Sequence, residues 1–198
     1  MTEAFNNADT PERRRRNRRM LLLIVGIFLG TMLVAGALRF SGWQPPTTKN
    51  SGELLQPPVD LRGFAPALAA GGTYAWNQDE RLWRVVVAPP ANCTADCDKI
   101  AQQLDTVWQS LGYRADRLEV LWLCEQDGCR APAPLGEDRS LRLLRPDPAL
   151  RALLPGVDAT GGLPLYVIDP NGFVILRYAP GADPGGLRAD LSKLLKLI

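Results

Sequence analysis

The sequence contains no histidine, and this absence excludes whole classes of functional site. Without an imidazole there is no Ser-His or Cys-His catalytic pair and no histidine-ligated metal centre. Methionine is also scarce, since Met1, Met20 and Met32 all lie within the first 38 residues. Beyond residue 38, cysteine is therefore the residue type that offers a soft sulfur ligand or a thiol nucleophile.

A basic excess is missing from most of the chain. The formal net charge is +2, but residues 1–19 carry six arginines against three acidic residues, which leaves the remainder at a net −1. Nucleic-acid binding depends on a basic surface, so the composition excludes a nucleic-acid partner. The arginines are better explained by membrane topology.

One long run lacks charge altogether. Residues 20–38 are uncharged and long enough for a helix to cross the roughly 30 Å hydrocarbon core of a bilayer. The preceding arginines predict that residues 1–19 form a cytoplasmic basic tail and that the rest is exported. We expect a single-pass protein of the bacterial inner membrane with its C-terminal domain in the periplasm. A signal peptide cleaved after Ala35-Gly36-Ala37 is the alternative.

The rest divides into a linker and one domain. Residues 39–60 are rich in Pro, Gly, Ser and Thr, which predicts a tether, and residues 61–198 form the domain. Its patterns predict strands at 81–88, 117–124, 163–169 and 173–179. They predict helices from the Cys93 loop to Gly112, at 146–156 and at 183–198. A strand–helix–strand start requires parallel pairing, and Asn171-Gly172 predicts a closing antiparallel hairpin. The fold class is therefore α/β, thioredoxin-like, tethered by one N-terminal transmembrane helix.

All four cysteines lie in this exported domain, where disulfides can form and persist. Cys93 follows the first strand, and Cys97 falls in the first turn of the next helix. The positive end of a helix stabilises a thiolate, so the pair could act as a redox couple or hold Cu(I) between two thiolates. A purely structural bridge remains the alternative.

The second pair follows the strand 117–124. Parallel strands end at the same sheet edge, so we expect Cys124 near Cys93, where it could be a resolving thiol or an extra copper ligand. The other interpretation is a local disulfide with Cys129, helped by a turn at Asp127-Gly128. Four cysteines allow three pairings, of which 93–97 with 124–129 is the simplest.

Two stretches, "ANCTADCDKIAQQL" and "LYVIDPNGFVILRYAPGADPGGLRADLSKLL", resemble the Sco family of membrane-anchored thioredoxin-fold proteins. Those proteins deliver copper to cytochrome c oxidase or maintain its copper-site thiols. The resemblance implies a divergent oxidase-assembly accessory, with an oxidase subunit or assembly factor as partner. It departs from the family at "TGGLPLYVID", where Leu163-Pro164 replace a histidine copper ligand. This departure argues against a three-ligand Cu(II) site of the Sco type, whereas Cu(I) held by Cys93 and Cys97 stays open.

Pro164 also resembles the cis-proline that faces the active-site cysteines in many thioredoxin-fold oxidoreductases. An ordinary strand-initial proline is the alternative. Three functions remain open: a Sco-type assembly accessory; a thiol–disulfide oxidoreductase in which Cys93 attacks and Cys97 resolves; and an interaction module with inert disulfides. Any enzymatic activity is at most thiol–disulfide exchange.

Overall fold

The computed structural model describes residues 11–41, 50–91, 93–133, 135 and 140–197. It divides into two units, Met1–Thr47 and Thr48–Ile198. The first unit contains one helix, α1 (Pro11–Phe40), with no buried residue. By length and composition this helix can cross a membrane, with a mean hydropathy of 2.6 over its most apolar stretch. The predicted span, residues 20–38, lies entirely within α1.

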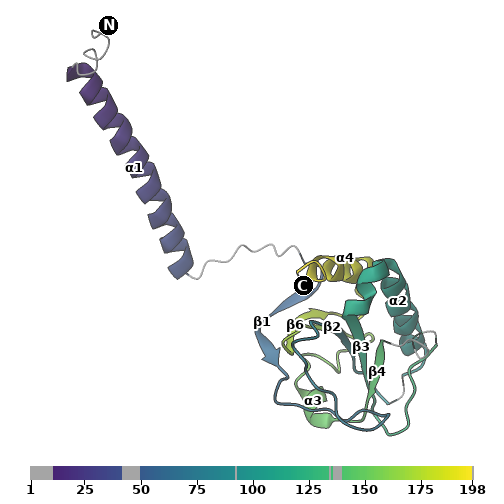
Figure 1. The fold of residues 1–198 in the computed structure, drawn as a ribbon. Helices are drawn as coiled ribbons and strands as arrows, with labels where there is room; N and C mark the ends of the chain where they lie inside the picture. The colour runs from purple at the N-terminus through teal and green to yellow at the C-terminus, as the bar shows by residue number, and fades with distance from the viewer. Residues whose placement is uncertain (1–10, 42–49, 92, 134, 136–139, 198) are drawn as a thin grey trace. The chain divides into compact units, whose positions relative to one another are not determined.

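The second unit is built on one six-stranded sheet (Figure 1). The strand order is β1-β6-β5-β2-β3-β4, in which β2, β3 and β4 pair in parallel and the other pairs are antiparallel. Its elements are β1 (Glu53–Asp60), β2 (Trp83–Val87), α2 (Ala95–Leu111), η1 (Gly112–Arg117), β3 (Leu118–Leu123), β4 (Leu141–Leu144), α3 (Pro148–Ala152), β5 (Leu165–Ile168), β6 (Phe173–Tyr178) and α4 (Pro184–Leu194).

The central strands are buried on both faces, which is why they read as continuous apolar runs. One face packs against α2 and α4, through residues such as Leu104 and Leu191. The opposite face packs against α3 and the segment after β1, through Leu150 and Tyr74. Figure 1 shows α2 and α4 on one side of the sheet and α3 on the other.

The predicted fold class is confirmed. Val85 of β2 lies opposite Val120 of β3 in a parallel pair, as the strand–helix–strand pattern requires. The predicted hairpin joins β5 to β6 through a tight turn, in which the amide of Gly172 donates to the carbonyl of Asp169 at 3.1 Å. Asp183 caps α4 by accepting hydrogen bonds from the amides of Gly185 and Gly186.

Two strands differ from the sequence prediction, and both lie at sheet edges. Residues 53–60, assigned above to the linker, form β1 and pair with β6. Pro57 and Pro58 lack an amide donor but are tolerated at an edge, where one side of the strand has no partner. Strand β4 has only four residues, too few to show a period. Residues 42–49 of the predicted linker lie outside the described part of the chain.

Candidate functional site

The first cysteine pair occupies the connection between β2 and α2. Cys93 lies just before the helix and Cys97 lies in its first turn, as predicted. The two residues form a disulfide with their Cα atoms 5.6 Å apart. A three-residue spacing across a helix start thus brings both sulfurs to one side of the turn.

The electrostatics of this helix start are mixed. The N-cap residue Thr94 makes no capping hydrogen bond through its side chain, so it satisfies none of the first amides. Asp96 and Asp98 place two negative charges in the first turn, where they compensate the positive end of the helix dipole. The helix therefore stabilises a thiolate here less than an uncompensated helix end would.

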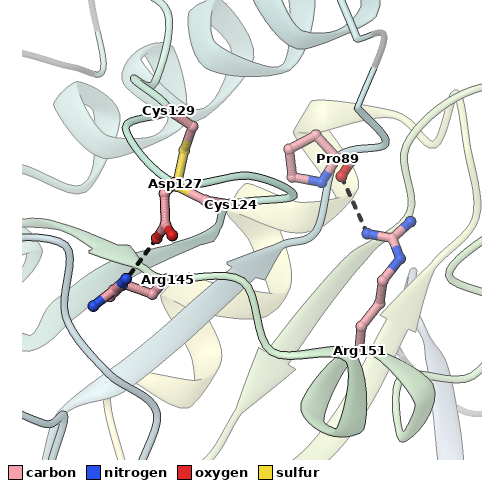
Figure 2. The surroundings of a disulfide bond; sticks show 6 residues. All are labelled: Pro89, Cys124, Asp127, Cys129, Arg145 and Arg151. Carbon is pink, nitrogen blue, oxygen red and sulfur yellow. Dashed lines mark hydrogen bonds and ion pairs between the residues drawn. A yellow bond between two sulfur atoms is a disulfide. The ribbon is translucent and has the colours of Figure 1, made fainter.

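The second pair closes a small loop directly after β3. Cys124 and Cys129 form a disulfide with their Cα atoms 5.8 Å apart, so the simplest pairing is the one present. Figure 2 shows this loop tied to the segment after β4, because Arg145 Nε donates to Asp127 Oδ1 at 2.9 Å. That hydrogen bond and the charge of Arg145 hold the pKa of Asp127 below its usual value. Gly128, at φ +75°, makes the turn.

All four cysteines line a single cleft of about 220 Å³. Cys97 and Cys124 are each only 4% exposed, whereas Cys93 and Cys129 are half-buried. Each disulfide therefore joins a buried, inner cysteine to a half-buried, outer one, and all four residues line the same opening. The expected proximity of Cys124 to Cys93 follows from the parallel pairing of β2 with β3. The charged residues of this cleft are Glu125 and Arg130.

Arg151 of α3 connects the two cysteine loops, and sequence reasoning missed it. Its Nη1 donates to the carbonyl oxygens of Ala88 and Pro89, at 2.9 and 3.1 Å, and so holds the segment that leads to Cys93. Figure 2 shows the hydrogen bond to Pro89. The same atom lies 3.7 Å from Glu125 Oε2, next to Cys124, and Nη2 donates to Asp158. No spacing in the sequence signals this role, because the partners lie far apart along the chain.

The structure does not support the cis-proline prediction for Pro164. Within the described residues the cis peptide bond is Gln56–Pro57, so Pro164 precedes β5 as an ordinary strand-initial proline. A second open cleft, of about 290 Å³, lies beside Cys93 and is lined by Leu163 rather than Pro164. It separates Cys93 from the loop that contains Ala159 and Gly162.

The site does not fit the three-ligand copper centre of the Sco family. Leu163, one of the two residues where the resemblance would place a histidine, lines the cleft beside Cys93 and has no side-chain atom that can bind a metal. Among the described residues, no group of three or more His, Cys, Asp or Glu side chains is placed to hold a metal ion. With no histidine in the chain, the cysteine thiolates are the soft ligands left.

One family model matches residues 83–198, more than half of the chain: the transmembrane-like, thioredoxin-like, C-terminal domain. The chain belongs to this family. The match begins at the first residue of β2 and includes both cysteine pairs, so the cleft lies wholly within the family's thioredoxin-like domain. Comparison with curated proteins finds no match.

Solved structures confirm the predicted resemblance to Sco proteins at the level of the fold. Yeast Sco1 with copper bound is 15% identical over 77% of this chain and 96% of its own, with a TM-score of 0.54. BsSco, a member of the Sco family of cytochrome c oxidase assembly proteins, is 13% identical over 79% and 100%, with a TM-score of 0.51. A SCO1/SenC family lipoprotein from Bacillus anthracis is 16% identical over 71% and 98%, with a TM-score of 0.51. At these identities the shared property is the fold.

Proposed function

We propose that this protein is a membrane-anchored thiol–disulfide exchange protein of cytochrome c oxidase assembly, which keeps the cysteine thiols of a copper site reduced. One observation carries the proposal. Cys93 is half-buried at a cleft while its partner Cys97 is 4% exposed, in a chain without histidine. An accessible attacking sulfur paired with a protected resolving sulfur is the arrangement that thiol–disulfide exchange needs.

The exchange proceeds in two steps from the reduced protein. The Cys93 thiolate attacks one sulfur of a target disulfide, and the other target sulfur leaves as a thiolate. The Cys97 thiolate then attacks Cys93 Sγ and releases the second target thiol. Two electrons pass to the target, and the Cys93–Cys97 disulfide seen here is the product state. A dithiol reductant must then restore the reduced pair.

The oxidase context is the part of the proposal that rests on likeness. Several proteins with the same fold are named as Sco-family members, and in BsSco a disulfide switch has been identified. A protein that acts on exported thiols also needs to be held at the membrane. Helix α1, which carries six arginines in its first part and the uncharged run after them, supports an anchor with the domain on the periplasmic side.

The activity is tested with the full chain in detergent micelles, reduced and freed of reductant. Exchange is followed with a fluorescent glutathione disulfide. These two variants are made in a chain whose Cys124 and Cys129 are replaced by serine, so that thiols of the second pair cannot react. In this background we expect Cys93→Ser to abolish exchange and Cys97→Ser to accumulate a mixed disulfide on Cys93. Undiminished exchange in Cys93→Ser would refute the proposal. If the unaltered chain shows no exchange, the remaining function is that of an interaction module with inert disulfides.

The oxidase context is tested separately in membranes. Expressed in cells that assemble the oxidase, the Cys97→Ser variant should trap a disulfide-linked cytochrome c oxidase subunit, identified by mass spectrometry. Cys93→Ser/Cys97→Ser serves as the matched control, because it lacks the attacking thiol. If the proteins trapped by Cys97→Ser never include an oxidase subunit, the oxidase context is refuted. The proposed exchange chemistry is unaffected by that result.

A second candidate function is transient Cu(I) handling by the reduced Cys93–Cys97 pair. The observation in its favour is that the two sulfurs meet on one side of the helix start and that both residues line an open cleft. Two thiolates suit Cu(I), which is the cargo in this scheme. A competition assay against a chromogenic Cu(I) chelator should give one-to-one binding that Cys93→Ser loses. If the reduced full chain does not bind Cu(I) in this assay, the copper-handling function is refuted.

Topology is tested by fusing alkaline phosphatase, which is active only after export, to the C-terminus. The arginines between residues 13 and 19 predict an active fusion, since basic residues stay in the cytoplasm. Replacing all six by glutamine should lower the fraction of correctly oriented protein. An inactive fusion in the unaltered chain would place the domain in the cytoplasm.

A further inference from the structure

We propose that the two cysteine pairs exchange a disulfide with each other, so that Cys124 and Cys129 supply the electrons used at Cys93 and Cys97. This inference deepens the proposed exchange function and rests on it. It gives the second pair a redox role and names the class of partner that must reduce it, an exported dithiol protein.

The shared cleft is the main observation. A disulfide with a purely structural role can lie anywhere in the fold. Here, however, all four cysteines line one opening of about 220 Å³. The outer cysteines of both pairs, Cys93 and Cys129, are the half-buried ones. Thiol exchange requires an accessible attacking sulfur and an accessible target sulfur, and these two residues are more exposed than their partners Cys97 and Cys124.

The loop of the second pair does not depend on its disulfide alone. Arg145 holds Asp127 at the tip of the loop, and the amide of Cys124 donates to the carbonyl of Leu144 at 3.0 Å. A bridge between residues five apart closes a short loop, which removes comparatively little entropy from the unfolded chain. The loop therefore has independent support while its disulfide is opened and closed.

Arg151 contacts both cysteine loops, the one that leads to Cys93 and the one that follows Cys124, and fixes their relative position. It donates to the carbonyl oxygens that precede Cys93, and its charge lies beside Glu125 in the loop of the second pair. With 15% side-chain exposure it is largely enclosed between them. One rigid group thus positions both reacting segments.

In the proposed exchange, the reduced second pair transfers its electrons to the oxidised first pair. With Cys124 and Cys129 reduced, the Cys129 thiolate attacks Cys93 Sγ; the Cys93–Cys97 bond breaks, and Cys97 leaves as a thiolate and takes a proton from water. Cys124, after losing its proton, attacks Cys129 Sγ and releases Cys93. Two electrons and two protons have moved from the second pair to the first. The external dithiol then reduces Cys124–Cys129 and becomes a disulfide itself.

The clefts around the pairs fit two separate partners. The cleft lined by Ala159 and Leu163 flanks Cys93, where a target disulfide would dock. A different cleft, lined by Leu68, Gly71 and Arg145, also includes Asp127 and Gly128 of the loop that the second disulfide closes. Target and reductant therefore have separate clefts beside the two pairs.

Two matched variants of the full chain in detergent test the relay. Cys124→Ser and Cys129→Ser lose the same disulfide but leave different thiols, the outer Cys129 or the inner Cys124. After blocking free thiols with a maleimide, peptide mass spectrometry identifies the linked cysteines. We expect Cys124→Ser to contain a Cys93–Cys129 bond with Cys97 blocked, at several times the level of any Cys93–Cys124 bond in Cys129→Ser. Intact Cys93–Cys97 bonds in both variants would overturn the relay.

A measurement on the unaltered chain guards against misfolding of the variants. Fully reduced protein is allowed to reoxidise and is quenched with maleimide at successive times. The Cys93–Cys129 link should appear before the final two disulfides; its absence at every time would overturn the relay. If Cys93→Ser abolishes exchange with glutathione disulfide in the chain that lacks Cys124 and Cys129, while no such link forms in the unaltered chain, the proposed function stands alone. Undiminished exchange of Cys93→Ser in that background refutes both.

Discussion

Arg151 Nη1 donates to the carbonyl oxygen of Pro89 at 3.1 Å (Figure 2) and lies 3.7 Å from Glu125 Oε2. One guanidinium thus contacts the segment before Cys93 and the residue after Cys124. The relationship is tertiary, because α3 lies about sixty residues from Pro89 along the chain. It explains how two loops without regular structure are held around one cleft.

The first prediction concerns replacement of the Arg151 guanidinium. Arg151→Ala leaves the carbonyl oxygens of Ala88 and Pro89 without their donor, which should lower the free energy of unfolding by about 1–3 kcal/mol. Reduction of Cys93–Cys97 by a small thiol should become faster, since the loop is less restrained. Denaturant titration and timed alkylation measure the two effects. The exposed Arg188→Ala is the control, and equal behaviour of the two variants would contradict the assigned role.

A second prediction concerns the start of the folded domain. A Cβ at Gly52 would lie 2.7 Å from Tyr178 Cζ, whereas a Cβ at Gly63 meets nothing within 4 Å. Gly52→Ala should therefore destabilise the protein by about 1–3 kcal/mol, because the buried ring must move. Gly63→Ala should change stability by less than about 0.5 kcal/mol. If thermal unfolding is the same for both variants, residue 52 belongs to a tether and not to the packed entry of β1.

The acid limb of the stability curve supplies a third prediction. Asp190 is 1% exposed and accepts hydrogen bonds from the amides of Ser51 and Gly52, from Tyr178 Oη and from Lys193. Burial acts to raise its pKa, but these hydrogen bonds outweigh burial and hold the pKa below the usual value. A lowered pKa stabilises the fold above about pH 4, and this contribution is lost as the pH falls.

Asp190→Asn should accordingly cost about 1–3 kcal/mol at neutral pH and flatten the loss of stability below about pH 4. Urea titrations between pH 2 and 7 compare the variant with the unaltered chain. The exposed Asp116→Asn, in η1, is the control. An unchanged pH slope in Asp190→Asn would show that the carboxylate contributes no charge-dependent stability.

The alkaline limb yields a fourth prediction. Burial, and then the hydrogen bond to Asp190, raise the pKa of Tyr178; burial and Glu119 raise the pKa of Tyr74 in the same direction. Since an unfolded tyrosine ionises near pH 10, stability is retained below that pH and falls above it. Tyr178→Phe should reduce the steepness of that fall. The 81% exposed Tyr113 provides the control, Tyr113→Phe, and a reduction of similar size there would contradict the prediction.

Much of the fold was predictable because it depends on local patterns. The buried strands are short apolar runs, the apolar residues of α2 recur at helical spacing, and Asn171-Gly172 marks the hairpin. Strand β1 was not predictable, because its proline content is typical of a linker. It becomes a strand only by pairing with a neighbouring strand that offers hydrogen-bonding groups. That neighbour, β6, lies more than a hundred residues away.

The same division applies to the candidate site. The sequence by itself determined which chemistry is available, because residue types are set before folding: no histidine, four cysteines, and a pair at a helix start. Tertiary structure decided which cysteines share a cleft, which sulfurs are buried, and that Arg151 lies between the loops. The physical reason is that exposure and long-range hydrogen bonds depend on packing between distant segments, which no local pattern encodes.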